Sequence, residues 1–269
     1  MPDEASKAVV RRMHTPGFVT RYFVGDGIDI GAGGDSLAQW HEQFPAMTSL
    51  KSFDGEEKAR PDILGDAETM EGIEDESYDF VHSAHCLEHM HNPATALGHW
   101  WRILKPGGHL IVIVPDEDMY EQGVWPSTFN PDHKATFTTA DLPTWSPVSL
   151  NVLYLVGRWL PNGRVIRIER LENTYRAWVT EQAGRIDQTA SSVTEAAIEF
   201  VVRKGLAPEP LTEITHAEAA IRSVAEGLNV SEEQVRADLD DMPDPVEPDT
   251  DENHQADVDE LEQFDREDE

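Results

Sequence analysis

The chain has 269 residues and a net charge of −31, from 52 acidic and 21 basic side chains. This length fits one complete α/β domain with a small addition and excludes two large domains. The negative charge repels phosphate groups, which disfavours nucleic acid and anionic membranes as partners. The single cysteine, Cys86, excludes an internal disulfide and an all-cysteine metal site. We find no transmembrane run and no apolar signal core, and therefore expect a cytoplasmic protein without membrane contact.

The acidic residues are concentrated toward the C-terminus. Residues 231–269 hold 18 acidic and 2 basic side chains. We expect residues 243–269 to form an acidic disordered tail, because they bury too little apolar surface to offset their ordering entropy. The rest of the chain is also acidic and poor in lysine. That composition is compatible both with a halophilic protein and with an ordinary acidic one.

Residues 208–242 are predicted to form a small helical appendage that resembles a helix-turn-helix in its apolar spacing. Ser231 and Gln234 are placed as a capping box at the start of its second helix. A helix that binds DNA should be basic or rich in amides, whereas this one carries Glu232 and Glu233. We therefore expect a contact with a protein partner, or a dimer, through residues 208–242.

Strands are expected where short apolar runs end at turn residues. In chain order, they are predicted over residues 27–30, 49–53, 62–64, 78–82, 109–114, 163–170 and 196–203. Helices are predicted after Asp35 as N-cap, over 93–104 and over 150–160. This alternation indicates a doubly wound, mostly parallel sheet. Residues 116–147 are rich in Pro, Thr and Asp and are expected to form a long loop or lid.

A glycine-rich turn at Gly31–Gly34 follows the first predicted strand. Glycine lets the backbone approach a ligand closely at the start of a helix. Asp54 ends the second strand, where a carboxylate can bind both hydroxyls of a ribose, and Asp66 ends the third. The pattern indicates a nucleoside cofactor. It does not indicate a dinucleotide, because Ser36 stands where the third glycine of that motif would be.

Five segments occur together in one order, and they resemble class I S-adenosylmethionine-dependent methyltransferases. They are DIGAGG at 29–34, Asp54, GDA at 65–67, YDFVHSAHCLEH at 78–89 and LKPGG at 104–108. The resemblance covers about residues 20–206 and is nearest to the small-molecule, ubiquinone/menaquinone-biosynthesis-like branch. It implies a Rossmann-like, seven-stranded, mostly parallel α/β sheet with an antiparallel last strand, in a methyltransferase domain at 1–207.

The resemblance also implies the cofactor, S-adenosyl-L-methionine, and the residues that bind it. The glycine loop would pass under the methionine part, Asp54 would bind the ribose, and Asp66 would contact the adenine amino group. The implied cofactor-binding residues are Asp29, Gly31, Ala32, Gly33, Asp54, Gly55, Asp66, Ala67, Ser83 and His85.

Four histidines, at positions 82, 85, 89 and 91, lie close together with Glu88. His85 and His89 are four residues apart and could share a helix face, which is a spacing that zinc ligands use. The segment nevertheless resembles a methyltransferase segment that binds no metal, so no metal ion is expected. His85 is a candidate general base, and a purely structural role for these histidines is the main alternative.

The lid is the expected wall of the acceptor site, because ligands of open α/β sheets lie beyond the carboxyl ends of the strands. His133 is the leading candidate for a catalytic base, with Lys134 as an anchor, although His133 could simply cap the loop. The Asp/Asn-Pro-Pro-Tyr signature of base and glutamine methylation is absent, since residues 82–85 are His-Ser-Ala-His. We expect methylation of a small molecule or glycan, at oxygen. A nucleic-acid methyltransferase and a non-catalytic cofactor-binding or interaction protein are the alternatives.

Overall fold

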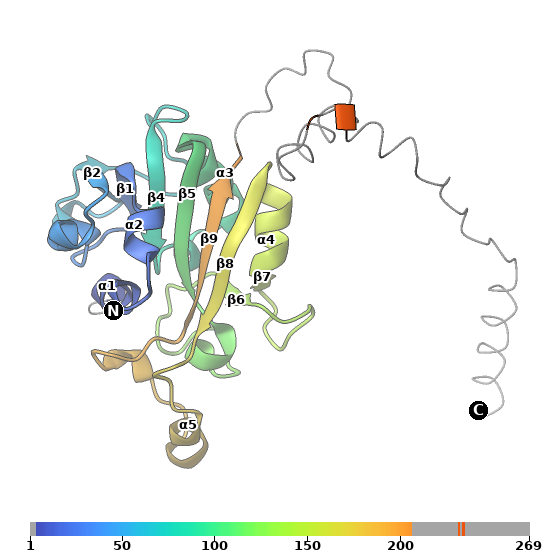
Figure 1. Ribbon diagram of the computed structural model, residues 1–269. Helices are drawn as coiled ribbons and strands as arrows, with labels where there is room; N and C mark the ends of the chain where they lie inside the picture. The colour runs from blue at the N-terminus through green and yellow to red at the C-terminus, as the bar shows by residue number, and fades with distance from the viewer. Residues whose placement is uncertain (1–3, 206–230, 232, 235–269) are drawn as a thin grey trace, which may run out of the picture. The chain divides into compact units, whose positions relative to one another are not determined.

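The computed structural model describes residues 4–205, 231, 233 and 234. A seven-stranded sheet with the strand order β3-β2-β1-β4-β5-β9-β8 lies at the centre of residues 4–205 (Figure 1). Its strands are β1 Gly25–Ile30, β2 Met47–Asp54, β3 Ile63–Leu64, β4 Tyr78–Ala84, β5 Leu104–Pro115, β8 Gly163–Leu171 and β9 Ala197–Lys204. The first five strands pair in parallel, and β9 runs antiparallel to both β5 and β8. The predicted doubly wound sheet with an antiparallel last strand is confirmed.

Helices and a small second sheet surround these strands. The α-helices are α1 Glu4–Met13, α2 Phe18–Tyr22, α3 Pro93–Ile103, α4 Val152–Trp159 and α5 Ala177–Ala183. Single 3₁₀ turns or short 3₁₀ helices occur at Leu37–Gln43, Glu57–Ala59, Leu87–His89 and Gln188–Ala190, and a π-helical turn occurs at Glu117–Glu121. Strands β6 Thr136–Thr138 and β7 Ser149–Asn151 pair in parallel with each other.

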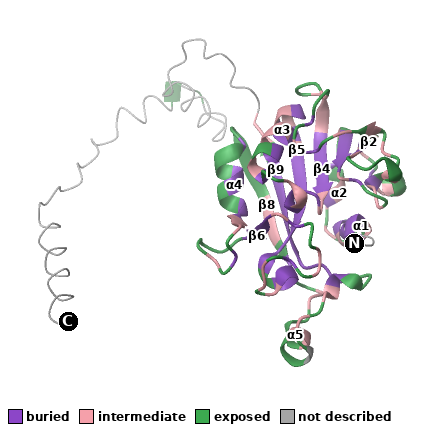
Figure 2. Ribbon diagram, turned by 180° about the vertical axis from the view of Figure 1, so that it is seen from behind, coloured by how far each residue is buried: buried purple, intermediate pink, exposed green. Residues whose placement is uncertain are grey.

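The central strands are apolar on both faces because helices cover both. Successive side chains of a strand point to opposite faces, so Val112 and Ile111 of β5 enter different cores. Val112 packs in the core that contains α3 and α4, whereas Ile111 packs with residues of α1 and α2. Figure 2 shows β4, β5 and β9 as largely buried. This double coverage explains the continuous apolar run that predicted β5.

The segment 116–147, predicted as a long loop or lid, is mostly irregular and contains the turn at Glu117–Glu121 and β6. Two local predictions are wrong. Asp35 does not cap the helix after the glycine loop; the Ser36 side chain accepts from the Ala38 N–H, and the helix is a short 3₁₀ one. His85 and His89 do not share a helix face, since the helical turn begins at Leu87 and His85 has a left-handed φ of 54°.

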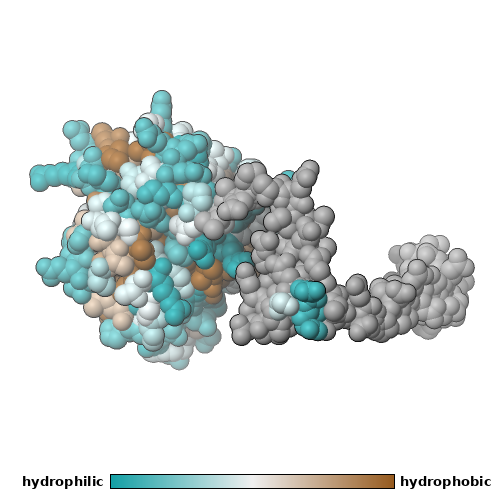
Figure 3. All heavy atoms as spheres, turned by 45° about the horizontal axis from the view of Figure 1, so that its top comes forward, coloured by the Kyte–Doolittle hydropathy of each residue, from teal (hydrophilic) through white to brown (hydrophobic). Residues whose placement is uncertain are grey.

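The predicted appendage at 208–242 and tail at 243–269 lie outside the described residues, apart from 231, 233 and 234. Within those three, the Gln234 N–H donates to Ser231 Oγ at 3.2 Å, which is one hydrogen bond of the predicted capping box. None of the helices that the structure describes has the length and apolarity to span a bilayer. The face drawn in Figure 3 is mainly hydrophilic, with small separate hydrophobic patches.

Candidate functional site

The glycine loop leaves the carboxyl end of β1 and is held against β2 by its backbone. The N–H groups of Gly31 and Ala32 both donate to the Phe53 carbonyl, at 2.9 and 3.2 Å. Gly31 has a φ of +69°, and a Cβ there would lie 2.5 Å from the side chain of Cys86. Glycine is therefore required at position 31 both by the backbone conformation and by the close approach.

Asp54 lies at the end of β2 and bridges the loop to the next turn. One of its carboxylate oxygens accepts from the Gly33 N–H at 2.8 Å and the other accepts from the Glu56 N–H at 2.8 Å. Each oxygen keeps a second lone pair, so the side chain can still accept from a pair of vicinal hydroxyls. This is the geometry that a ribose site needs at the end of the second strand.

The turn after β3 places the two residues predicted for the adenine end. Asp66 is exposed and its carboxylate accepts from the Glu68 N–H at 2.8 Å. Ala67 is buried, and its carbonyl accepts from the Trp100 indole N–H at 2.8 Å. Gly55 is exposed beside Asp54, and a Cβ at this position would lie 3.5 Å from the Gly65 carbonyl. The α3 tryptophan thus anchors this turn through one hydrogen bond to its backbone.

Asp29 is buried under the loop and connects it to α1. Its Oδ2 accepts from Ser36 Oγ and from the Leu37 N–H, both at 2.9 Å. Its Oδ1 lies 2.7 Å from His82 Nδ1, and the Nε2 of that ring accepts from Arg12 at 3.0 Å. Burial and the nearby Arg12 lower the pKa of His82 despite the Asp29 carboxylate, so the ring is neutral.

A small cavity of about 150 Å³ opens between the loop, α1 and the turn after β4. Five predicted cofactor-binding residues line it, namely Asp29, Gly31, Ala32, Gly33 and His85. Asp54, Gly55, Asp66, Ala67, Ser83 and His133 are not among its lining residues. Its volume is below the size of typical ligand pockets, so it fits one end of a ligand whose remainder lies outside.

The small cavity is rich in acidic groups. Glu4, Asp29 and Asp35 line it together with His85 and His89. Such a lining favours a cationic ligand end, such as an ammonium or sulfonium group. Burial works against protonation of His85, but the carboxylates of Glu88 and Glu4 outweigh it and raise the pKa of this histidine.

The lid brings His133 close to this turn without opening it to the cavity. The His133 ring is fully buried, and its Nδ1 lies 2.7 Å from a carboxylate oxygen of Glu121. The Lys134 N–H donates to the Glu88 carbonyl at 2.7 Å, which fixes the lid on the turn after β4. The Lys134 ammonium pairs with Asp132. Among lid residues, Asn130 lines the small cavity.

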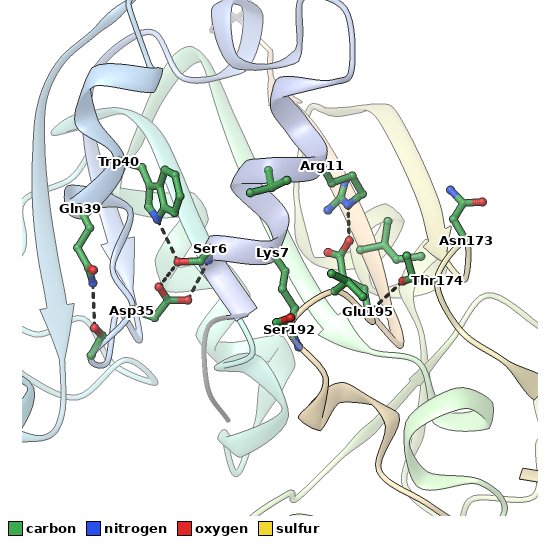
Figure 4. Close-up of a pocket in the computed structure, with 14 residues that line it drawn as sticks. Ser6, Lys7, Arg11, Asp35, Gln39, Trp40, Asn173, Thr174, Ser192 and Glu195 are labelled. Atoms are coloured by element: carbon green, nitrogen blue, oxygen red, sulfur yellow. Dashed lines mark hydrogen bonds and ion pairs between the residues drawn. The ribbon is translucent and has the colours of Figure 1, made fainter. Parts of the chain in front are cut away.

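A larger cavity of about 770 Å³ lies over the outer face of α1 (Figure 4). Its floor is formed by α1, and its walls come from the 3₁₀ helix at Leu37–Gln43 and from residues 171–174 and 192–195. The polar groups there bind one another: Ser6 bonds with Asp35, and Arg11 pairs with Glu195. The two cavities share Gly34 and Asp35 of the glycine loop.

Three residues of this region were not predicted from the sequence. Glu4 and Ala5 line the small cavity from α1, and Glu121 contacts His133. The apolar spacing of Ala5, Ala8 and Val9 could have indicated α1. No local pattern places Glu121 beside His133, because that contact depends on how the lid folds.

A family model described as "Methyltransferase domain" matches residues 28–112. The matched segment runs from β1 into β5 and contains every predicted cofactor-binding residue. Residues 28–112 are therefore similar to a methyltransferase domain, and the observed sheet order is that of the Rossmann-like methyltransferase fold. No curated protein sequence matches this chain.

Several solved structures are similar to this chain. An S-adenosylmethionine dependent methyltransferase from Mesorhizobium loti has 17% identity and a TM-score of 0.46, covering 73% of this chain and 96% of that one. A SAM-dependent methyltransferase from Methanosarcina mazei has 13% identity and a TM-score of 0.46, covering 71% and 98%. The YcgJ protein from Bacillus subtilis has 13% identity and a TM-score of 0.46, covering 75% and 100%. At these identities the likeness concerns the fold.

Proposed function

We propose that this protein transfers a methyl group from S-adenosyl-L-methionine to a small-molecule or glycan acceptor, at oxygen. The observation that carries the proposal is the relation between the glycine loop and Asp54. The loop bounds an acidic cavity, and the Asp54 carboxylate stands at the next strand end, bonded to Gly33 of the same loop. One ligand with a cationic end and a ribose can use both features at once.

The donor would lie across the carboxyl ends of β1, β2 and β4. Its methionine end would enter the small cavity over Gly31, Ala32 and Gly33, with Ser83 and His85 at the inner end. Its ribose would bind Asp54 beside Gly55, and its adenine would lie over Ala67 near Asp66. The acidic lining would favour the donor over the demethylated product, because the donor carries an additional positive charge on sulfur.

The acceptor would approach from the lid, where Asn130, His85 and His89 meet the cavity. The leaving group is already positively charged, so in-line positioning supplies much of the catalysis. An oxygen acceptor also needs to lose a proton. His133 is the proposed base, supported by the Glu121 contact, which places the ring proton on Nδ1 and leaves the lone pair on Nε2. His85 is the second candidate base, but its raised pKa favours the protonated form.

Methylation of nucleic acid is the less favoured alternative on electrostatic grounds. Two arginines of β8 are already paired, Arg167 with Glu169 and Arg170 with Asp116. Paired arginines on an acidic protein attract phosphate weakly. A non-catalytic binding protein stays the alternative if the donor binds and no acceptor is methylated.

Three finer assignments are also proposals. The ubiquinone/menaquinone-biosynthesis-like branch is supported by the order of the five motifs. A protein partner or dimer contact through residues 208–242, and a halophilic cytoplasmic setting, are supported by the sequence composition. Deletion of 208–269 should then change assembly while leaving donor binding intact.

The test of the proposed function is transfer of a labelled methyl group from S-adenosylmethionine. Hydroxylated aromatics, hydroxy acids, sugars, oligosaccharides, DNA and RNA would be compared as acceptors at low and high salt. Label on a small hydroxylated compound or sugar, released by chemistry specific for methyl ethers or esters, supports the proposal. Label on nucleic acid overturns the acceptor class, and label on nitrogen overturns the attacked atom.

A further inference from the structure

The turn after β4 and the lid bring three metal-ligating side chains together, two of them adjacent in sequence and the third from the lid. Glu88 Oε1 lies 4.0 Å from His89 Nε2 and 4.0 Å from His133 Nε2. One ligand atom from each of the three residues lies within 4.8 Å of the others. These separations are too long for hydrogen bonds. The three atoms are close enough together for one ion to contact them all.

Both imidazole rings are oriented by an acceptor on their other nitrogen. His133 Nδ1 hydrogen-bonds to the Glu121 carboxylate at 2.7 Å, and His89 Nδ1 hydrogen-bonds to the Asp132 backbone carbonyl at 3.3 Å, with the Asp132 carboxylate at 3.0 Å. An acceptor on Nδ1 holds the ring proton there and directs the Nε2 lone pair away from it. Both lone pairs are therefore available on the side of Glu88. Carboxylate–histidine pairs of this kind commonly support the ligands of a metal ion.

Glu88 and His133 present buried atoms that have no hydrogen-bond partner. Both carboxylate oxygens of Glu88 and the Nε2 of His133 are buried and unsatisfied, and the Glu88 side chain has no exposed surface. His85 Nδ1 lies 3.4 Å from Glu88 Oε1, so a protonated His85 offsets part of the charge, but neither oxygen of Glu88 accepts a hydrogen bond. A buried carboxylate without hydrogen bonds is costly, and a cation bound directly to it would remove that cost.

We propose that Glu88, His89 and His133 bind one divalent transition-metal ion, with Zn²⁺ as the best match to two imidazole nitrogens and one carboxylate oxygen. Zinc accepts this ligand set at ~2.1 Å and leaves a fourth position open. Donors at that bond length stand ~3.4 Å apart in a tetrahedron, so the side chains need only a small inward movement. Mg²⁺ and Ca²⁺ prefer oxygen ligands and fit less well.

This proposal differs from the expectation that no metal ion binds here, and it changes the role of His133. The zinc-like spacing in the sequence pairs His85 with His89, whereas the structure places His133 of the lid, rather than His85, with Glu88 and His89. A bound ion makes His133 a ligand and removes it as a base. His89 also lines the small cavity in which the donor is proposed to bind. The open position of the ion would therefore suit an oxygen of the acceptor. This last consequence rests on the proposed function, whereas metal binding itself does not.

The experiment is a titration of the full chain with Co²⁺ and Zn²⁺ after removal of metals by a chelator. Co²⁺ held by two histidines in a four- or five-coordinate site gives intense visible absorption, whereas Co²⁺ on surface carboxylates gives weak octahedral bands. We expect one intense site per chain, displaced by one equivalent of Zn²⁺. His133→Ala and Glu88→Gln should each abolish it, and Glu121→Gln should weaken it by about 10–100-fold.

His91→Ala is the matched control, because its side chain is 82% exposed and lies two residues from His89. It should bind Co²⁺ as the wild type does. Circular dichroism shows whether His133→Ala and Glu88→Gln fold. If either does not, His89→Ala takes its place as the ligand-deletion variant, because the His89 side chain is partly exposed. The absence of an intense Co²⁺ spectrum in the folded wild type, or its survival in His133→Ala, would overturn the proposal. S-adenosylhomocysteine binding by the metal-free protein is measured separately, so failure of the metal site and failure of the donor site are distinguishable.

Discussion

His82 Nε2 accepts a hydrogen bond from the Arg12 guanidinium at 3.0 Å. Because arginine stays protonated, this nitrogen must carry a lone pair, and the ring proton must lie on Nδ1, toward Asp29. The contact ties α1 to the carboxylate that holds the glycine loop. On its other side Arg12 donates to Glu199 at 2.8 Å, so a continuous buried network runs from β9 to the glycine loop.

Arg12→Leu should destabilise the protein strongly, because Glu199 loses one of its two arginine partners inside the core. Removal of one member of a buried ion pair typically costs about 3–5 kcal/mol. Urea unfolding would measure the change in free energy. The exposed Arg158 of α4 offers a control, since Arg158→Leu should change the unfolding free energy little. Equal effects of the two substitutions would contradict the importance of this network.

Gly31→Ala should impair both folding and donor binding. The new Cβ meets Cys86 at 2.5 Å, and the residue must keep a φ of +69°. Gly34→Ala is a matched control in the same loop, because a Cβ at that position meets no atom within 4 Å. Thermal melts of both variants measure the effect on folding, and titrations with S-adenosylhomocysteine measure the effect on ligand binding. A Gly31→Ala protein that melts and binds like Gly34→Ala would show that the loop has a different conformation.

Stability should fall as the pH is lowered, over two ranges. Burial and the nearby Arg203 lower the pKa of His109 from 6.5 to about 4. In the unfolded chain His109 therefore binds a proton near pH 6.5, whereas in the folded chain it binds one only near pH 4. Between these pH values the proton favours the unfolded chain, so the folded state is destabilised. Arg12 and Arg11 outweigh burial and lower the pKa of Glu199 from 4.5 to about 2, so further stability is lost below about pH 4.5.

His109→Leu tests the upper of these ranges. The variant should show a smaller decrease in unfolding free energy between pH 6.5 and 4.5 than the wild type. The lower range, below pH 4.5, should be unchanged, because Glu199 and its arginines remain. Denaturant unfolding at several pH values measures both slopes. An unchanged slope between pH 6.5 and 4.5 would contradict the neutral state of His109 in the folded protein.

Salt should weaken binding of S-adenosylmethionine more than binding of S-adenosylhomocysteine. The donor has one more positive charge, and the cavity that would receive its methionine end contains Glu4, Asp29 and Asp35. Screening by salt reduces this attraction more for the ligand that has the additional charge. Titrations of both ligands at low and molar salt give the ratio of dissociation constants. A ratio that does not change with salt would place the sulfonium away from these carboxylates.

The parts of the fold that depend on local pattern could be predicted from the sequence. The apolar run that ends in β5 and the α3 helix capped at Asn92 follow from hydrophobic periodicity and turn residues. The sequence predicts Asp35 as the N-cap of the helix after the glycine loop. In the structure the Asp35 carboxylate instead accepts hydrogen bonds from Ser6 of α1. That competition comes from tertiary structure, which a local pattern does not contain.

The candidate site likewise has one part that could be predicted from the sequence and one part that could not. The loop residues and Asp54 follow from one glycine-rich turn and from the rule that ligands bind at the carboxyl ends of parallel strands. The meeting of Glu88 with His133 could not be predicted, because it depends on the path of the lid. The same is true of Glu4, which reaches the cavity because α1 lies across the sheet face.

The most direct test of the central claim is calorimetric titration with S-adenosylmethionine and S-adenosylhomocysteine, at high salt, on the wild type and Asp54→Ala. Asp26→Ala is the control, because Asp26 is an exposed carboxylate that binds side chains near the opposite end of β1. We expect one site per chain in the wild type and in Asp26→Ala, with binding lost or strongly weakened in Asp54→Ala. A folded wild type that binds neither compound would contradict the assignment of a methyl donor site.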